Sequence, residues 1–195
     1  MLAAARSIIL NDGVDALAHG VIARQLSMSK SAVLYHFPTK QSLWMGLVED
    51  YVEHLNHEKT RHEAAWISLG LTPDEAVLPG MHDWYQSFRL NEEGWVDVGS
   101  TLIGFAKHDP TLIEPVRLWY QRLYEQIESS GLPRIEAFAA MMTFDGFFNA
   151  TKLGIMVLPP KEVKAIALRV LKEAFAQRPQ KLAIICSQFS ANAVD

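Results

Sequence analysis

Apolar side chains recur at helical spacing along the first forty residues, and short polar clusters interrupt them. Residues 2–11 are mostly alanine, leucine and isoleucine, and Asn11, Asp12 and Gly13 follow as a helix-ending signal. Farther along, an apolar face is formed first by Ile22, Ala23 and Leu26 and then by Met28, Val33 and Phe37. A polar run over 29–31 lies between these groups, so the pattern predicts two short helices joined by a tight turn.

The ends of these two helices are marked by residues that cap or stop a helix. The hydroxyl of Ser29 can cap the second helix, Pro38 cannot continue it, and Thr39 can cap the next one. Ser27 occupies the turn, where glycine is usual because a positive φ costs it nothing. Leu17-Ala18 precede the first helix of the pair, so we expect that helix to lack a side-chain cap.

A longer periodic segment follows, with apolar residues four apart at Leu43, Leu47, Tyr51 and Leu55. It predicts one long helix near 40–62 that leaves the helix-turn-helix. His54 and His57, with Asp50 and Glu58 nearby, are residue types that bind metals. On a charged helix face such neighbours more commonly form solvated pairs, and we expect neither a metal site nor a cofactor.

Proline, glycine and capping residues divide the remainder of the chain. Thr72 and Glu75 form a capping-box pair around Pro73, and Pro79-Gly80 is expected to end that short helix. Further helices are predicted near 81–91, 96–108, 113–130, 134–156 and 160–177. No strand alternation or internal repeat competes with these helices, so the predicted fold class is all-α. Residues 180–195 fit either a helix or an ordered tail.

Three segments together form a specific pattern: Ile22-Ala23, Met28-Ser29-Lys30-Ser31, and Leu34-Tyr35-His36-Phe37-Pro38-Thr39-Lys40. Over residues 2–47 this pattern resembles the DNA-binding signature of the TetR/AcrR family of bacterial transcriptional regulators. Ser27, Leu34 and Leu17-Ala18 depart from it. The resemblance implies a three-helix DNA-binding domain over 1–47 and a larger helical bundle for effector binding and dimerisation over 48–195.

The local distribution of charge and the net charge of the chain point to different conclusions about a nucleic-acid partner. The formal net charge of the chain is −4, which argues against a nucleic-acid partner. Between 19 and 40, however, three cations occur without any Asp or Glu. From their positions in the motif, the expected DNA-contacting residues are Arg24, Ser29, Lys30, Ser31, Ala32, Tyr35, His36 and Lys40.

Aromatic residues are concentrated in the second domain and could line an apolar effector pocket. Packing in an ordinary core is the alternative for each of them. TetR-like regulators carry an effector pocket in this module, which favours the pocket for the group as a whole. The candidate lining residues are Trp84, Phe88, Phe105, Trp119, Phe144 and Phe148.

The segment 134–156 is apolar around most of its circumference, interrupted mainly by Asp145, Asn149 and Lys152. Such a helix is expected to be covered on all sides. With the helix after it, the segment resembles the pair that dimerises TetR-like proteins as a four-helix bundle. The candidate seam comprises Phe147, Leu153, Val163, Ile166, Val170 and Leu171. A homodimer would place two recognition helices on a near-palindromic operator.

Other functional classes find less support in the residues. No phosphate loop, nucleophile elbow, HExxH motif or Cys–His pair is present, so we expect no catalytic site. The one cysteine, Cys186, and the lack of a membrane span or signal peptide favour a cytoplasmic protein. We therefore expect a repressor released from DNA by a small apolar or amphipathic effector. The alternative is a helical protein-binding module that has lost specific DNA binding.

Overall fold

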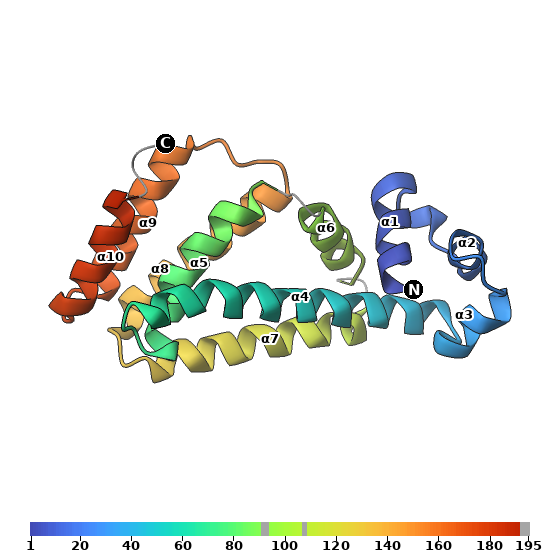
Figure 1. Ribbon diagram of the computed structural model, residues 1–195, viewed down its shortest axis with the longest axis horizontal. Helices are drawn as coiled ribbons and strands as arrows, with labels where there is room; N and C mark the ends of the chain where they lie inside the picture. The colour runs from blue at the N-terminus through green and yellow to red at the C-terminus, as the bar shows by residue number, and fades with distance from the viewer. Residues whose placement is uncertain (91–93, 107–108, 192–195) are drawn as a thin grey trace. The chain divides into compact units, whose positions relative to one another are not determined.

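The computed structural model describes residues 1–90, 94–106 and 109–191, and within these residues it consists of helices without strands (Figure 1). The chain separates into two compact units by packing. The first comprises Met1–Leu55 with Asn91–Trp119, and the second comprises Asn56–Leu90 with Tyr120–Asp195. Our division at residue 47 is a functional one and stays a prediction, whereas the predicted all-α fold class is confirmed.

The N-terminal helices follow the sequence pattern. Helix α1 (Leu2–Asp12) is followed by a short 3-10 helix, η1 (Val14–Ala16), and then by α2 (His19–Gln25) and α3 (Lys30–His36). Helix α1 contacts α2, and α2 contacts α3. The side chains of Ile8, Leu17, Ile22 and Val33 are almost completely buried and form the small core that holds these helices together.

Helix α4 (Lys40–Ser68) is the longest element and contributes to both units. In the first unit its large buried side chains are those of Leu43, Trp44, Leu47, Val48, Tyr51 and Leu55. Helix α6 (Trp95–Ala106) packs here through Phe105, whose ring stacks on Trp44 at a centroid distance of 4.1 Å. Helix α7 (Pro110–Ser129) begins beside the start of α4, where the amide of Gln41 donates to Asp109 over 3.2 Å.

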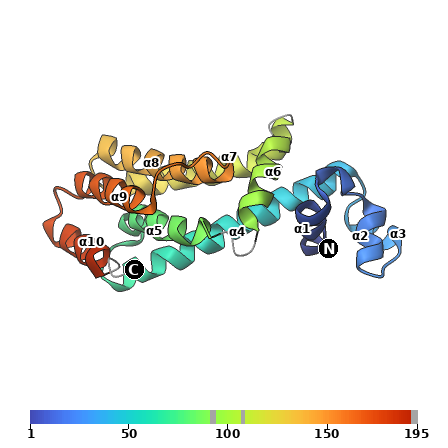
Figure 2. The same ribbon diagram turned by 90° about the horizontal axis from the view of Figure 1, so that it is seen from above.

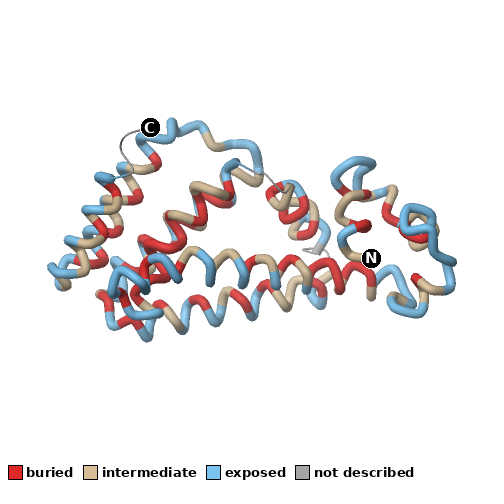
Figure 3. The backbone as a smooth tube through the Cα atoms, in the orientation of Figure 1, coloured by how far each residue is buried: buried red, intermediate tan, exposed pale blue. Residues whose placement is uncertain are grey.

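The second unit is built around α5 (Pro73–Phe88) and α8 (Arg134–Lys152), with α9 (Pro160–Ala174) and α10 (Pro179–Ala191) packed in sequence against them. Helices α8 and α9 pack against each other and lie side by side in Figure 2. Burial extends along nearly all of α5, as the red tube in Figure 3 shows. The rings of Phe144, Phe148 and Phe175 are central to the core of this unit.

The expected helix end at Pro79-Gly80 is wrong, because α5 continues through both residues to Phe88. A proline inside a helix removes one backbone hydrogen bond. Here the apolar face continues at helical spacing on both sides of it, through Val77, Leu78, Met81, Trp84, Tyr85 and Phe88, which are all buried. Burial of that face offsets the lost bond, so tertiary packing overrides the local breaker.

The other helix boundaries differ from the sequence-based ones by a few residues. Helix α8 ends at Lys152 rather than near 156, because Gly154 adopts a positive φ of 66° and the amide of Ile155 donates to the Ala150 carbonyl. Residues 179–191 form a helix, which resolves that ambiguity for the described part of the tail. Among the described residues, none of the helices combines the length and apolar character needed to cross a membrane.

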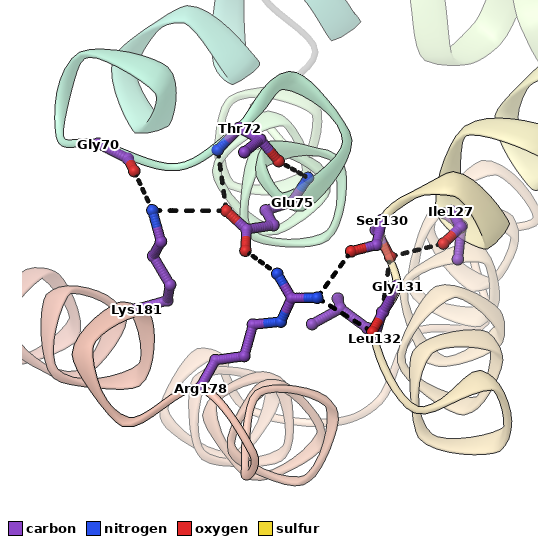
Figure 4. A network of polar contacts seen from close by, with 9 residues as sticks. All are labelled: Gly70, Thr72, Glu75, Ile127, Ser130, Gly131, Leu132, Arg178 and Lys181. Carbon is purple, nitrogen blue, oxygen red and sulfur yellow. Dashed lines mark hydrogen bonds and ion pairs between the residues drawn. The ribbon is translucent and has the colours of Figure 1, made fainter.

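A polar network fixes the start of α5 within the second unit (Figure 4). Thr72 and Glu75 form the predicted capping box, so that prediction is confirmed. The Glu75 side chain is 1% exposed and also pairs with Arg178 and Lys181. The Arg178 guanidinium in turn donates to the carbonyls of Ser130 and Gly131, both over 3.1 Å. One buried carboxylate therefore links α5, the α7–α8 turn and the α9–α10 connection.

Candidate functional site

The turn between α2 and α3 is closed by backbone hydrogen bonds around a residue in the left-handed region. Ser27 has a φ of 53°, and the amide of Met28 donates to the Ala23 carbonyl over 2.8 Å. This six-to-one bond is typical of a helix end whose next residue is usually glycine. A serine adopts this conformation at an energetic cost, so the departure noted in the sequence is a strained position in the fold.

The recognition helix has the boundaries that the sequence predicts. The Ser29 hydroxyl accepts from the amide of Ala32 over 3.1 Å, which confirms it as the cap of α3. Helix α3 ends at His36, before Pro38, and the Thr39 hydroxyl accepts from the amide of Ser42 over 3.0 Å at the start of α4. Ala18, at the start of α2, supplies no side-chain cap, also as predicted.

The candidate DNA-contacting residues lie on α2, α3 and the start of α4, and nearly all of them are exposed. Ala32 is partly covered. The other seven are exposed, and these are Arg24, Ser29, Lys30, Ser31, Tyr35, His36 and Lys40. Tyr35 is the extreme case, with 83% of its surface exposed. The opposite side of α3 is held by Val33, which is fully buried. The surface carries cations and hydroxyls but no carboxylate between residues 19 and 40.

Two residues that the sequence pattern did not single out hold the end of the recognition helix. The Nε2 atom of His19 lies 2.8 Å from the Phe37 carbonyl oxygen, which accepts, so Nε2 carries the proton. The Phe37 ring also lies against Gly46 of α4, where an added Cβ would be 2.8 Å from the ring. A histidine at a helix start and a glycine inside an apolar helix were the available signals, and neither indicates its partner.

Helix α1 is tied to α4 and α6 within the first unit. Arg6 pairs with Asp50, and its guanidinium lies 4.3 Å from the centroid of the Trp95 ring. The same tryptophan stacks on His54 at 4.1 Å with an interplanar angle of 8°. Asp50 and His54, which the sequence analysis weighed as metal ligands, therefore take part in an ion pair and a ring stack that hold α1, α4 and α6 together.

The six candidate effector-binding residues fall into two groups. Trp84 and Phe88 of α5 and Phe144 and Phe148 of α8 are buried in the second unit. The Phe148 ring lies 5.0 Å from Trp84 and 4.9 Å from Phe88, so these side chains form a packed aromatic cluster. Phe105 and Trp119 belong to the first unit. The structure thus brings four of the six together, and their role in ligand binding stays a prediction.

The six candidate dimer residues differ in how far their own chain covers them. Phe147, Val163 and Leu171 are buried within the chain, Ile166 and Val170 are half-buried, and Leu153 is 68% exposed. Leu153, at the C-cap of α8, ends an exposed stripe with spacings of four and three, whose other members the sequence analysis did not assign to the seam: Ile135, Ala139, Met142, Gly146 and Asn149. Ile135 is 74% exposed and Met142 is 48% exposed. We call these six residues the α8 stripe.

The polar residues Asp145, Asn149 and Lys152 do not form one solvated face. Tyr120 donates to the Asp145 carboxylate over 3.0 Å, while the Lys152 ammonium lies 5.7 Å from the centroid of the Phe88 ring. Burial raises the pKa of Asp145, and the Tyr120 hydrogen bond and the Lys152 charge only partly oppose that rise. Asn149 alone of the three belongs to the α8 stripe.

His82 and Asp83 are neighbours in the chain, and their side chains contact each other in α5. The Nδ1 atom of His82 lies 2.9 Å from Asp83 Oδ1, because the flexible carboxylate reaches across to its neighbour. Asp83 also accepts from the Trp66 indole over 2.7 Å. The pair is thus part of the packing between α4 and α5.

The fold defines a class of protein in which an N-terminal helix-turn-helix precedes a larger helical bundle. Residues 92–174 match the family model described as the tetracyclin repressor-like C-terminal domain. This match to a C-terminal domain supports membership of the TetR family of transcriptional regulators. A search of curated proteins and a search of solved structures found no match to the chain.

Proposed function

We propose that the chain is a DNA-binding transcriptional repressor that works as a homodimer and is released from its operator by a small effector. The observation that carries the proposal is the surface of α3, where exposed hydroxyl and cationic side chains occur without a carboxylate. A helix with this surface can enter a major groove, and its cations can contact phosphates. The TetR-like C-terminal domain supports the effector and dimer parts of the proposal.

Within the interface, the side chains divide by the kind of contact that they can make. Lys30, Ser31, Ala32 and Tyr35 are assigned to base edges, and His36, Lys40 and Arg24 to the phosphate backbone. The short side chains of Ser31 and Ala32 permit a close approach to the bases. A base contact determines sequence preference, whereas a phosphate contact strengthens binding to all sequences.

A second candidate function is a protein-binding module of the same fold without specific DNA binding. The strained Ser27 turn and the uncapped start of α2 favour it, because both weaken the helix-turn-helix. Selection of bound fragments from random double-stranded DNA separates the two candidates. Enrichment of a near-palindromic sequence supports the regulator, and a salt-sensitive binder without enrichment supports the alternative.

The test of the interface compares Lys40→Ala and Tyr35→Ala by fluorescence anisotropy on the selected DNA. Lys40→Ala should weaken binding to every sequence and flatten the plot of log K against log salt by about one unit per subunit. Tyr35→Ala should change the preferred sequence instead. Lys172→Ala, on an exposed part of α9, is the control and should leave both properties unchanged. An unaltered salt dependence for Lys40→Ala would remove this residue from the phosphate contacts.

A further inference from the structure

The second unit contains an open cleft at the end of α5, apart from the buried aromatic cluster. Its volume is about 210 Å³. The walls come from the last turns of α5, the end of α8, the α8–α9 connection and the first turn of α9. The lining residues are Tyr85, Gln86, Arg89, Thr151, Met156, Leu158, Pro160 and Val163.

One part of the cleft is apolar. Val163 and Tyr85 are almost fully buried and form its floor, and Met156, Leu158 and Pro160 add apolar surface nearer to solvent. Since a water molecule takes roughly 30 Å³, the volume corresponds to a ligand of roughly seven to ten non-hydrogen atoms. Binding of an apolar group of that size in the cleft is favoured, because it removes apolar surface from water.

The other part of the cleft presents hydrogen-bond donors. Arg89 Nε donates to the Gln86 side chain over 3.2 Å, which leaves the terminal nitrogens of its guanidinium to donate elsewhere. The hydroxyls of Tyr85 and Thr151 are 3.0 Å apart, and a mutual bond uses only one of their two protons. A ligand oxygen in the cleft would therefore meet a cation and a hydroxyl donor.

The charge around the cleft favours an anion. In the part of the chain that the structure describes, Arg89 is the one charged residue of the lining, and the charged chain neighbours of Thr151, Pro160 and Val163 are Lys152, Lys161, Glu162 and Lys164, three cations and one carboxylate. The walls contain the positive end of the α9 dipole and the negative ends of the α5 and α8 dipoles, which together leave roughly half a negative charge, less than the full positive charge of Arg89. The guanidinium of Arg89 then decides the preferred sign of the ligand charge.

We propose that this cleft binds a small amphipathic monocarboxylate. The carboxylate accepts from the Arg89 guanidinium, as planar carboxylates do in paired hydrogen bonds, and the apolar part lies against Val163, Met156 and Leu158. The inference deepens the proposed function, on which it rests for its regulatory meaning, by giving the effector a place and a chemical class. It moves the effector site away from the buried aromatic cluster.

Isothermal titration calorimetry of the full chain tests the binding with octanoate, benzoate, octanol and octylamine. Octanoate and benzoate should bind, and octanol and octylamine should bind at least about tenfold more weakly, because they cannot accept paired hydrogen bonds from the guanidinium. Arg89→Gln should reduce octanoate affinity about 10- to 100-fold and leave octanol binding unchanged. Arg61→Gln, an exposed arginine of α4 paired with Glu58, is the matched control and should bind octanoate normally.

The wild-type ligand series needs no variant, so a folding defect in Arg89→Gln cannot hide the result. Equal affinity for octanoate and octanol, or tighter binding of octylamine, would overturn the proposal. Repeating the DNA titration with bound octanoate tests the regulatory role of the cleft separately from its ability to bind the ligand. Binding that leaves DNA affinity unchanged keeps the cleft and contradicts its regulatory role, whereas DNA binding without any octanoate binding keeps the regulator and removes the cleft.

Discussion

Ser27 shows how a single residue can oppose the conformation that its fold requires. Its φ of 53° lies where a non-glycine residue costs roughly 1 kcal/mol or more. Ser27→Gly should therefore raise the free energy of unfolding by about 0.5–1 kcal/mol, after allowing for the extra flexibility of glycine in the unfolded chain. Urea unfolding followed by circular dichroism measures the change.

The control for this prediction is Gln25→Gly, two residues earlier at the exposed end of α2. There the backbone is helical, so glycine should lower the free energy of unfolding by up to about 1 kcal/mol. The two glycine variants are thus expected to change stability in opposite directions. A destabilised Ser27→Gly protein would show that the serine is not strained at the turn.

Glu75 is the most deeply buried carboxylate among the described residues, with a relative exposure of 1%. Burial by itself would raise its pKa, but the hydrogen bonds of Thr72 and Arg178 and the charge of Lys181 outweigh burial, so its pKa lies below the ordinary value. A depressed pKa stabilises the fold above the unfolded-state value, near about 4.3, and this contribution is lost as the pH falls through the folded-state pKa. The wild-type protein should lose stability in acid partly through this group.

Glu75→Gln should remove that acid-sensitive contribution. At neutral pH we expect a loss of about 2–3 kcal/mol in the free energy of unfolding, because Arg178 loses its buried partner. Below about pH 4 the difference from the wild-type protein should shrink. Glu128→Gln, which breaks the exposed pair with Arg134, should cost less than about 1 kcal/mol at either pH. A constant difference across this range would contradict the assigned charge role of Glu75.

At the scale of elements, local signals predicted most helix boundaries. The Ser29 and Thr72 caps and the stop at Pro38 act within one helical turn, so they can be read from neighbouring residues. Pro79 misled the analysis because the burial that outweighs it involves residues distant in the chain. The same limit applies to the candidate site: the residues proposed to contact DNA are local to α3, whereas the His19–Phe37 contact and the Arg89 cleft exist only after folding.

Packing between α4 and α6 depends on a close approach at Gly99. A Cβ added there would lie 2.8 Å from the hydroxyl oxygen of Tyr51 and 2.9 Å from its ring. Because Tyr51 is almost fully buried, Gly99→Ala should lower the free energy of unfolding by about 1–3 kcal/mol. Gly104→Ala, on the same helix with open space around it, should raise it by up to about 1 kcal/mol. Thermal unfolding of the two variants measures the direction of each change in stability. A stabilised Gly99→Ala protein would contradict the packing described.

At the scale of the whole molecule, the α8 stripe changes the expected form of the dimer seam. The sequence analysis read α8 as covered all round, and within one chain its buried side is indeed filled by Phe144 and Phe147. The stripe through Ile135 and Met142 remains exposed, with the small residues Ala139 and Gly146 between them. Small residues permit close helix contact, so this surface suits a second copy of α8 better than the residues already buried under α9.

The dimer prediction follows from that surface. In a two-fold interface each residue occurs twice, so Met142→Asp would bury two unpaired carboxylates against apolar neighbours. The chain should still fold, because Met142 is 48% exposed in one copy. We expect the dimer dissociation constant to rise about 100-fold or more, measured by sedimentation equilibrium at micromolar concentration. Ile67→Asp, at an exposed position on α4, is the control and should remain dimeric.

A second consequence concerns DNA. Because a monomer presents one recognition helix, Met142→Asp should also lose affinity for an operator with two half-sites, and the salt dependence of its DNA binding should be that of one subunit on one half-site. A Met142→Asp protein that sediments as a dimer would exclude the α8 stripe from the seam, and a monomeric wild-type protein would exclude the homodimer itself.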